Sequence, residues 1–368
     1  MVLKGTYGTA VVYSDSVDQG AIDQIKTLLE QPMTKGANVR IMPDVHAGAG
    51  CVIGYTARVT DTIVPNLIGV DIGCGVLAIR LHEHEKITDL QALDSIARTQ
   101  VPLGFSIHRK AIYEKELSRV KETCRATKQD YERVMRSIGT LGGGNHFIEL
   151  ALDDEENQWL IVHSGSRNFG LKVAQFYQTM ATKLHPEAPK SLAWLEGDAL
   201  NLYLRDMKVA QNYAQLNRKV IVNSILQAVI GTHHEDDSHL KVESIHNYID
   251  FNDNIIRKGA ISAALDEPVI IPFNMRDGSI LGYGKGNKAW NFSAPHGAGR
   301  LMSRTQAKNK LSLSQFKAEM AGVYSTSVNK STLDEAPMAY KNAQEIIGYL
   351  EPTVEVGSML KPIWNLKG

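Results

Sequence analysis

The chain has 368 residues, 43% of them hydrophobic and 22% charged, which is the ordinary balance of a globular protein with a sizeable buried core. Its 40 basic and 40 acidic side chains give a formal net charge of zero, which argues against extensive non-specific binding to nucleic acid. Three scattered cysteines are too few for a disulfide framework and indicate a reducing, cytoplasmic setting.

In the first half of the chain, short apolar segments alternate with amphipathic ones. Residues 1–16 lack a basic region followed by an apolar run, so we expect no signal peptide. No stretch reaches the roughly 18 consecutive apolar residues of a membrane span. Apolar, β-branched composition predicts strands within Cys51–Val59 and Leu67–Leu81. Helical periodicity predicts helices at Val17–Leu29 and Thr88–Gln100 and a long, charged helix at Ala111–Met135.

The second half continues without an internal repeat and without a linker rich in Pro or Ser. Strands are predicted at Glu149–Ala151, Trp159–His163, Pro268–Pro272 and Ser279–Tyr283. Helices are predicted at Asn168–Leu184, Gly197–Ile230, Gly297–Lys308, Ser312–Met320 and Leu333–Leu350. Because a regular βαβ alternation is not visible, the pattern favours one compact α+β domain over residues 1–368, with mixed or antiparallel sheets at the core and helices packed outside.

Gly, His, Asn and Asp gather in loops at the ends of the predicted strands. The segments are MPDVHAGAG (Met42–Gly50), VDIGCG (Val70–Gly75), GGGNHF (Gly142–Phe147), HSGSRNFG (His163–Gly170), the IHNY around His246, and APHGAGR (Ala294–Arg300). Loops that carry reactive side chains on a rigid scaffold are where function usually lies. We therefore expect the functional site among these segments.

Asp71 and Cys74 lie three positions apart in a glycine-rich turn. A thiolate, a carboxylate and imidazoles suit a borderline divalent metal, although a cysteine in an apolar strand is more often a small buried hydrophobe. His146 and His163 each end a predicted strand beside glycines, and a hydrogen-bonded loop histidine is the simpler explanation for either one alone. The four side chains together favour a metal site, which His246 would complete.

Two glycine-containing turns suit a phosphate. The segment His163–Arg167 lies in a predicted strand-to-helix turn, where backbone N–H groups and a guanidinium can surround an anion; the alternative is a plain helix cap by Ser166. His296 is followed by Gly-Ala-Gly and a predicted helix that carries Arg300 and Arg304. A histidine ring nitrogen is a competent nucleophile toward phosphorus. The alternative there is a buried histidine at a helix start.

The segment HHEDDSH, from His233 to His239, has the highest local density of metal-ligand side chains in the chain. It contains no glycine and follows the end of the long predicted helix. Polar runs of this kind are usually solvated loops, so we do not place the catalytic metal site there.

Taken together and in this order, MPDVH, GVDIGCG, GGGNHF, HSGSR and PHGAGR closely resemble the RtcB family of RNA-splicing ligases, from Met42 to about Ala307 with a weaker tail to Gly368. AQNYAQLNR (Ala210–Arg218), on the long predicted helix, is similar to the family as well. The resemblance implies an enzyme that joins RNA 3′-phosphate or 2′,3′-cyclic phosphate ends to 5′-hydroxyl ends with GTP and two Mn²⁺ ions, in RNA repair or tRNA splicing. Participation of an activator protein (archease) or a release-factor-like partner stays open.

The resemblance also implies roles for individual side chains. His296 is expected to be the nucleophile that takes GMP. The expected metal ligands are Asp71, Cys74, His146, His163 and His246, with Cys74 between two ions. The guanylate pocket is expected to be lined by Asn145, Glu149, Asn247, Pro272, Phe273, Asn274, Met275, Ser279, Gly297, Ala298, Gly299 and Lys367. Arg167 and Arg300 are expected to contact phosphates.

The segment IPFNMRDGS departs from the small-residue nucleotide loop of the family, because Phe273 and Asn274 replace small residues and Arg276-Asp277 add charge. This departure motivates an alternative function, a metal-dependent cyclic phosphodiesterase or RNA end-processing hydrolase that does not ligate. A third hypothesis is an RNA- or ribosome-binding module with a relic site. Retention of all the expected metal ligands and of the nucleophile argues against the third.

Overall fold

Two β-sheets form the framework of the protein, and the computed structural model describes residues 1–231 and 239–368. In the six-stranded sheet, β2 and β3 run parallel, joined through helix α1 (Gln19–Leu29), and the other neighbouring strands are antiparallel. Its strands, in spatial order, are β1 (Val2–Lys4), β2 (Thr9–Val12), β3 (Val39–His46), β4 (Ile53–Arg58), β12 (Ile255–Lys258) and β11 (Asn247–Asp250).

The seven-stranded sheet is antiparallel throughout. Its strands, in spatial order, are β10 (Lys241–Ile245), β6 (Gly75–Arg80), β8 (Gln158–Ser164), β7 (Phe147–Leu152), β17 (Val354–Lys367), β15 (Gly278–Gly284) and β14 (Pro268–Asn274). Two short ribbons complete the strands: β13 (Ala260–Ser262) with β16 (Ser293–Pro295), and β5 (Thr62–Ile63) with β9 (Leu195–Glu196). The predicted fold class, α+β with mixed and antiparallel sheets and helices outside, is confirmed.

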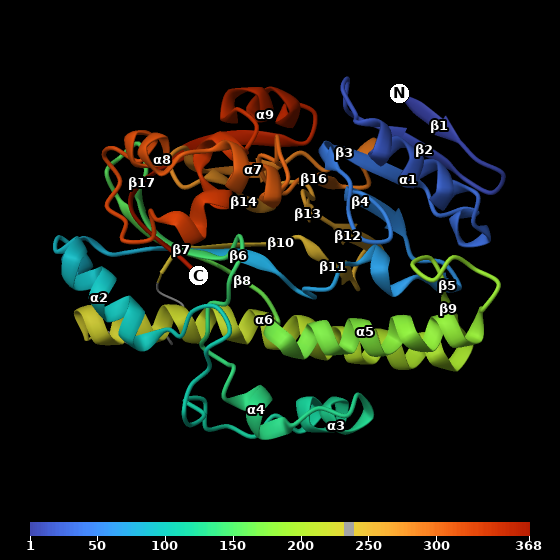
Figure 1. Cartoon of the computed structure of the whole chain (residues 1–368), viewed down its shortest axis with the longest axis horizontal. Helices are drawn as coiled ribbons and strands as arrows, with labels where there is room; N and C mark the ends of the chain where they lie inside the picture. The colour runs from blue at the N-terminus through green and yellow to red at the C-terminus, as the bar shows by residue number, and fades with distance from the viewer. Residues whose placement is uncertain (232–238) are drawn as a thin grey trace.

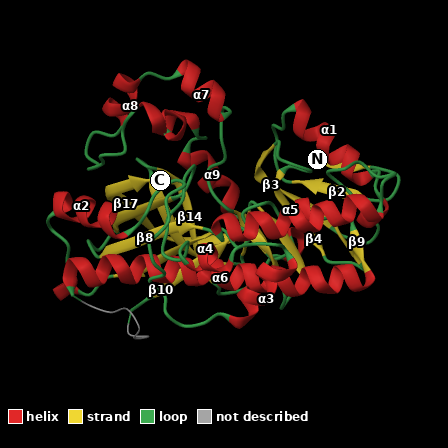
Figure 2. Cartoon of the chain, turned by 60° about the horizontal axis from the view of Figure 1, so that its bottom comes forward, coloured by secondary structure: helices red, strands yellow, loops and turns green. Residues whose placement is uncertain are grey.

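The helices lie on the outside of these sheets (Figures 1 and 2). The two long helices, α5 (Arg167–Leu184) and α6 (Gly197–Ile230), run along one side of the molecule beneath strands of both sheets (Figure 1). The other helices are α2 (Leu90–Gln100), α3 (Ser118–Ala126), α4 (Tyr131–Met135), α7 (Arg304–Lys310), α8 (Leu313–Glu319) and α9 (Ala343–Leu350). Short 3-10 turns are η1 (Pro32–Thr34), η2 (Pro65–Leu67), η3 (Glu83–Glu85), η4 (Lys288–Trp290), η5 (Lys330–Glu335) and η6 (Pro337–Ala339).

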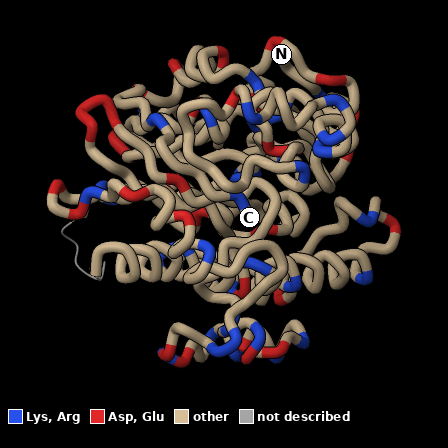
Figure 3. Tube along the Cα trace, turned by 60° about the vertical axis from the view of Figure 1, so that its left-hand side comes forward, with Lys and Arg blue, Asp and Glu red and all other residues tan. Residues whose placement is uncertain are grey.

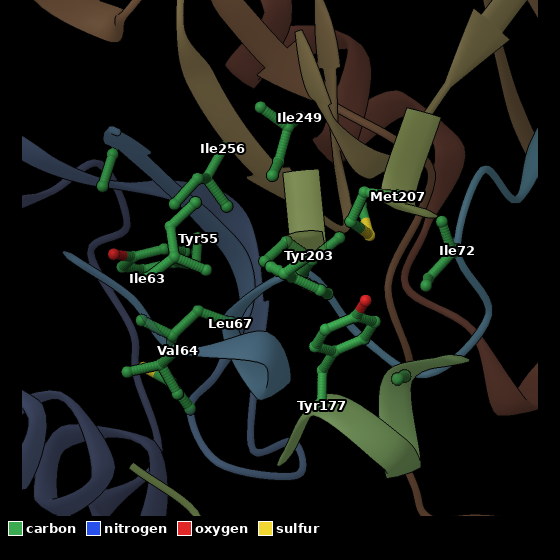
Figure 4. Close-up of a cluster of buried hydrophobic side chains, with 14 of the residues drawn as sticks. Tyr55, Ile63, Val64, Leu67, Ile72, Tyr177, Tyr203, Met207, Ile249 and Ile256 are labelled. Atoms are coloured by element: carbon green, nitrogen blue, oxygen red, sulfur yellow. The ribbon is translucent and has the colours of Figure 1, made fainter. Parts of the chain in front are cut away.

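The largest core cluster lies where α5 and α6 meet the six-stranded sheet (Figure 4). Tyr177 from α5 and Tyr203 from α6 are buried with their ring centroids 5.1 Å apart, and Tyr55 of β4 belongs to the same cluster. Such an aromatic pair contributes about 0.5–1.5 kcal/mol beyond the burial of its area. Because α6 contacts strands of both sheets, this packing fixes the two sheets relative to one helix.

The prediction of one charged helix over Ala111–Met135 is wrong, because the segment forms two shorter helices, α3 and α4. Lys128, between them, has a φ of 57°, a left-handed conformation that ends α3. Asp130 then caps α4, since its carboxylate accepts hydrogen bonds from the backbone N–H groups of Glu132 and Arg133. The predicted strand at Leu67–Leu81 is also too long, because only its second half forms a strand, β6.

Two predicted helices near the C-terminus begin too early. Helix α7 begins at Arg304, because Gly299 has a φ of 68° and Ser303 forms a capping box with Gln306. Arg300 therefore lies in a loop and not on a helix. The segment Leu333–Leu350 forms η5, η6 and α9 instead of one helix, because Pro337 cannot continue a helix from the preceding turn.

Charged residues of both signs are interspersed along the trace, including in α3 and α4 (Figure 3). Within residues 1–231 and 239–368, no helix combines the length and the apolar character needed to cross a bilayer. The assignment of residues 1–368 to one RtcB-like ligase domain stays a prediction.

Candidate metal centre and nucleophile

Four of the predicted ligands lie at one end of four neighbouring strands, in the order β10, β6, β8 and β7. Gly75, the first residue of β6, pairs with Ser164 on one side and with Ile245 on the other. Because the strands are antiparallel, the starts of β6 and β7 and the ends of β8 and β10 meet at the same edge. Cys74, His146, His163 and His246 each occupy the last or adjoining position at that edge, although they are far apart in sequence.

The first ligand group consists of Cys74, His163 and His246. The Nε2 atoms of His163 and His246 are 3.0 Å apart, and the Sγ atom of Cys74 is 3.3 Å from His163 Nε2. All three side chains are buried. Burial is the main cause that lowers the pKa of His163 well below its usual value, and the neighbouring imidazoles add to it. Burial, with a smaller effect of the nearby His296, likewise lowers the pKa of His246 well below its usual value. Both rings are therefore neutral, as metal ligation requires.

The second ligand group consists of Asp71, Cys74 and His146. His146 Nε2 is 3.0 Å from Asp71 Oδ2 and 3.3 Å from Cys74 Sγ. The other ring nitrogen, Nδ1, lies 2.9 Å from the carbonyl oxygen of Leu141, a contact that orients the ring with Nε2 toward Asp71 and Cys74. Although burial acts in the opposite direction, the hydrogen bond and charge of His146 hold the pKa of Asp71 below its usual value.

The two groups share the Cys74 sulfur, so they form one continuous site with two places for a cation. Burial, followed by the Asp71 charge, raises the pKa of the Cys74 thiol well above its usual value. A cation is therefore needed to hold the thiolate form in this position. One thiolate, one carboxylate and three imidazoles are a donor set that fits divalent transition metals. The predicted ligands are thus brought together in an arrangement that could hold two such ions.

His296 lies beside this site, with its ring centroid 4.9 Å from that of His246. Its Nδ1 atom is 2.7 Å from Oδ2 of Asp44, which is fully buried in β3. A carboxylate at Nδ1 fixes the tautomer in which Nδ1 carries the proton and Nε2 carries the lone pair. A neutral nucleophile needs such a partner at Nδ1, and Asp44 was not named for this role from the sequence. The MPDVH motif, in which Asp44 lies, is the signal that could have identified it.

Helix α6 holds the loops that carry the ligands. The Arg218 guanidinium donates to the carbonyls of Gly73 at 2.7 Å and Ser164 at 2.8 Å, next to Cys74 and His163 respectively. The neighbouring Asn217 accepts from the N–H of Gly139 at 2.8 Å and donates to Ser164 Oγ at 3.0 Å. Both side chains are fully buried. AQNYAQLNR thus orients the ligand loops, a role that could have been inferred from polar residues on the buried face of an apolar helix.

Two glycines are required by close approach in these loops. Gly73 has a φ of 72°, and a Cβ there would lie 2.9 Å from Ala214 Cβ on α6. A Cβ at Gly165 would lie 2.3 Å from Asp71 Oδ1. Side chains at these positions would push the Cys74 loop off α6 and displace the Asp71 carboxylate. The glycines of VDIGCG and HSGSR therefore serve the ligand geometry.

The start of α5 is occupied by a carboxylate of the protein. The Ser166 N–H donates to Asp71 Oδ1 at 3.1 Å, so the expected phosphate position at this helix start is held by Asp71. Ser166 makes no side-chain cap, so the plain-cap alternative is wrong, while phosphate contact by Arg167 stays a prediction. Arg167 donates to Thr140 Oγ1 and to the carbonyl of Gly104, each at 3.2 Å.

A cavity of about 300 Å³ opens beside His296. It is lined by eleven of the twelve predicted pocket residues, namely Asn145, Glu149, Asn247, Pro272, Phe273, Asn274, Met275, Gly297, Ala298, Gly299 and Lys367. Ser279 is not among the lining residues of the described chain; it is fully buried in β15, opposite Pro272 of β14. Glu149 is buried, and its Oε1 atom has no hydrogen-bond partner among the described residues. Burial raises its pKa to about 8.

Three basic side chains border this cavity and surround Glu335, a buried residue of η5. The sequence did not indicate Glu335 as a residue of the site. Glu335 lies 3.3 Å from Arg300, 3.2 Å from Arg304 and 3.1 Å from Lys367. Although burial acts the other way, Lys367 and the two arginines hold the pKa of Glu335 below its usual value. The carboxylate thus keeps three cations together at the cavity wall. The sequence around Glu335 carries no motif that would indicate this role.

The segment IPFNMRDGS, which differs from the nucleotide loop of the family, directs its added charges away from the cavity. Arg276 pairs with Asp277 at 2.6 Å and also with Glu319 of α8, and neither Arg276 nor Asp277 is among the described residues that line the cavity. Asn274 closes the turn by accepting from the N–H of Asp277 at 2.9 Å. The added charge therefore does not enter the pocket.

Of the segment HHEDDSH, residues 233–238 lie outside the described residues. His239 is described, and the expectation that it belongs to a solvated loop is wrong. Its side chain is 4% exposed and its Nε2 atom lies 2.7 Å from Glu85 Oε2. The reason is that Leu240 and His239 directly precede β10, whose hydrogen bonding to β6 draws the chain into the protein.

The fold and this arrangement define the site of a metal-dependent enzyme, with His296 beside the two ligand groups. Residues 24–128 and 108–368 match the family described as tRNA-splicing ligase RtcB. The chain is 32% identical to RNA-splicing ligase RtcB1 of Escherichia coli ATCC 25922 and to RNA-splicing ligase RtcB of Escherichia coli K12, covering 90% of each chain. It is 28% identical to tRNA-splicing ligase RtcB of Aeropyrum pernix, over 98% of this chain and 95% of that one. The chain belongs to the RtcB family, and it is an RNA ligase.

We predict that Cys74→Ala weakens both cation sites, whereas His146→Ala weakens one. Cys74 belongs to both ligand groups, while His146 belongs to one of them. In each variant the affinity for Mn²⁺ should fall by more than the roughly 10–100-fold that follows removal of a residue that hydrogen-bonds to a metal ligand. Calorimetric titration with Mn²⁺ measures the number of sites and their affinities. Cys124→Ala, at a buried free cysteine in α3, is the control. Two undiminished sites in Cys74→Ala would contradict the shared sulfur.

We also predict that Arg218→Met lowers the free energy of unfolding by about 3–5 kcal/mol. The substitution leaves Glu243 and the Gly73 and Ser164 carbonyls without their buried cationic partner. Lys219→Met, at the exposed neighbouring position, should change it by less than about 0.5 kcal/mol. Denaturant unfolding measures both. Equal effects of the two substitutions would show that Arg218 does not brace the loops.

Proposed function

We propose that this RNA ligase uses GTP and Mn²⁺ to join a 3′-phosphate or 2′,3′-cyclic phosphate end to a 5′-hydroxyl end through GMP bound covalently to His296. The observation that carries the proposal is the position of His296, oriented by buried Asp44 and adjacent to two ligand groups that share Cys74. The three cysteines are buried and free, which supports a cytoplasmic setting for this work.

The guanylate would lie in the cavity beside His296. Guanine presents two neighbouring N–H donors on one edge, and the Glu149 carboxylate, with one oxygen lacking a partner, can accept both. The other Glu149 oxygen is held by the Asn365 amide at 2.8 Å, which fixes the orientation of the carboxylate. The cations around Glu335 lie along the same wall and suit the triphosphate. The absence of Ser279 from this lining removes it from the proposed pocket.

The two Mn²⁺ ions would be held by the two ligand groups, one by Cys74, His163 and His246 and the other by Asp71, Cys74 and His146. When bound, Mn²⁺ would neutralise the negative charge that develops on the phosphates. The protein contributes neutral imidazoles, an ionised Asp71 and fixed loops. These features prepare the site before substrates arrive, which reduces the reorganisation needed during the reaction.

Three displacements at phosphorus would then complete ligation. Nε2 of His296 attacks the α-phosphorus of GTP, forming a P–N bond while pyrophosphate leaves. An oxygen of the RNA 3′-phosphate attacks the same phosphorus, which breaks the P–N bond and returns the lone pair to His296. The 5′-hydroxyl oxygen attacks the activated 3′-phosphate, losing its proton as GMP leaves. A cyclic end must first be opened by water to give the 3′-phosphate.

The RNA would approach from a second cavity, of about 590 Å³, on the other side of the ligands. Asp71 and His146 line it, together with Arg133, Arg167 and Arg304. These arginines supply a local basic surface in a chain of zero formal net charge. Arg304 lines both cavities and is suited to contact the phosphate that passes between the substrates.

The alternative of a hydrolase that does not ligate rested on the altered nucleotide loop. Since Arg276 and Asp277 pair outside the cavity, the added charge no longer favours it, whereas Phe273 and Asn274 do line the cavity. It is nevertheless a distinguishable outcome, because a hydrolase would process cyclic-phosphate RNA fully without GTP.

We expect purified protein with Mn²⁺ and GTP labelled at the α-phosphate to form an acid-labile protein–GMP adduct. His296→Ala should abolish it, because the attacking nitrogen is lost. Asp44→Asn should reduce its rate by about 10²–10⁴-fold, since the ring loses the carboxylate that sets its tautomer. Gel analysis of the labelled protein measures both. The function would be wrong if no adduct formed under any metal condition, or if His296→Ala still formed one.

We further expect GTP affinity to rise with pH between 6 and 8. Burial raises the pKa of Glu149 to about 8, so at lower pH the empty pocket holds a protonated carboxyl that cannot accept both guanine donors. Each pH unit below that value should cost up to about tenfold in affinity. Titration with an analogue of GTP that cannot transfer GMP isolates binding from chemistry. Glu149→Gln should bind weakly and lose this pH dependence, and an unchanged profile would contradict the assignment.

A further inference from the structure

The two strands that carry Cys74 and His246 also carry imidazoles at their opposite ends. Strands β6 and β10 pair from Gly75–Ile245 to Ile79–Lys241, and the ladder continues with a 3.0 Å bond from the Arg80 N–H to the Leu240 carbonyl. His82 follows β6 and His239 precedes β10, immediately beyond that bond. The eight positions from Cys74 to His82 correspond to roughly 26 Å of extended chain, so this second end lies well away from the catalytic ligands.

Glu85, in η3, completes a compact cluster at this second end. His239 Nε2 lies 2.7 Å from Glu85 Oε2, and the His82 and His239 rings are 4.1 Å apart between centroids. One ligand atom from each of the three side chains lies within 4.8 Å of the others. Glu85 and His239 are buried, while His82 is half-buried. The cluster therefore has a closed inner side and one side nearer to solvent.

We propose that His82, Glu85 and His239 form a second metal site, which binds one zinc-type divalent cation apart from the catalytic ligand groups. Two imidazoles and one carboxylate are a common protein ligand set for Zn²⁺. With metal–ligand distances of about 2.0–2.2 Å, tetrahedral ligand atoms are separated by roughly 3.3–3.5 Å. Reaching that geometry needs the Glu85–His239 contact to lengthen by less than about 1 Å, which side-chain rotation can supply.

A simple ion pair between Glu85 and His239 accounts for the arrangement of these three side chains less well than a metal site does. An ion pair needs two side chains, whereas a third, imidazole-bearing residue lies against His239 with its ring tilted by 42°. The backbone N–H of His82 also donates to Glu85 Oε2 at 2.9 Å, which holds the carboxylate in place. The carboxylate is thus fixed between the two imidazole-bearing residues.

A cation at this cluster would fasten the β6–β10 ladder at the end far from the active site. The ladder sets the register in which Cys74 and His246 meet, because Gly75 pairs with Ile245. A slip of one residue would turn the side chains of β10 to the opposite face of the sheet. The cluster is therefore a structural site whose loss leaves the catalytic ligands in place but makes the strand pair easier to separate.

Cobalt titration of the full chain tests this site, because Co²⁺ reports its ligands by its spectrum. In Cys74→Ala, which lacks the catalytic sulfur, we expect one tetrahedral Co²⁺ ion without a sulfur-to-cobalt charge-transfer band. Adding His82→Ala or Glu85→Gln to that variant should remove the signal. Adding His84→Ala should leave it unchanged, since exposed His84 lies beside His82 but is not one of the three ligands. Circular dichroism verifies that each variant is folded.

A second measurement keeps the proposal testable if a cluster variant is poorly folded. Zn²⁺ should raise the Tm of Cys74→Ala, and His82→Gln should abolish that rise while keeping a polar side chain of similar reach. The proposal is overturned if Cys74→Ala binds no tetrahedral Co²⁺, or if the signal survives in both His82→Ala and Glu85→Gln. None of these readouts depends on GTP or on ligation.

Discussion

The position of the Cys74 sulfur between two candidate ligand groups, one with His163 and His246 and one with Asp71 and His146, is the constraint on which the rest of the site depends. Its distances of 3.3 Å to both His146 and His163 place one atom within reach of two cations. A buried thiol with a raised pKa gains a thiolate form only where positive charge accompanies it. The neighbouring loops, the paired strands and α6 can all be understood as means of holding this one atom in place.

The antiparallel sheet brings together candidate ligands that lie far apart in the sequence. Cys74, His146, His163 and His246 are separated by as many as 172 positions, yet each adjoins the same end of four neighbouring strands. Helix α6 then crosses beneath that end and holds the loops through Asn217 and Arg218. Buried polar side chains of this kind cost desolvation energy unless they are paired, so the hydrogen bonds that Asn217 and Arg218 make to these loops favour a single arrangement of the ligands.

The sequence indicated which side chains come together as candidate ligands, because glycines and histidines in loops are local features with a chemical meaning. Helices α1, α5 and α6 were predicted for a similar reason, since their periodicity is continuous, and Asp18 before α1 and Gly231 after α6 are ordinary end signals. The charged segment before Met135 was misassigned because a left-handed Lys128 interrupts a pattern that composition alone does not break. The partners of Asp44, Glu335 and Arg218 lie at distant positions, so their roles were not assigned from the sequence. The MPDVH motif and the polar residues of α6 marked Asp44 and Arg218 as candidates, whereas nothing marked Glu335.

The most direct test of the shared sulfur is a crystal structure of the protein soaked with Mn²⁺, with anomalous scattering used to locate the ions. We expect two peaks, both within bonding distance of Cys74 Sγ, one also bound by His163 and His246 and the other by Asp71 and His146. A single peak at full occupancy, or two peaks of which one does not contact the sulfur, would contradict this expectation.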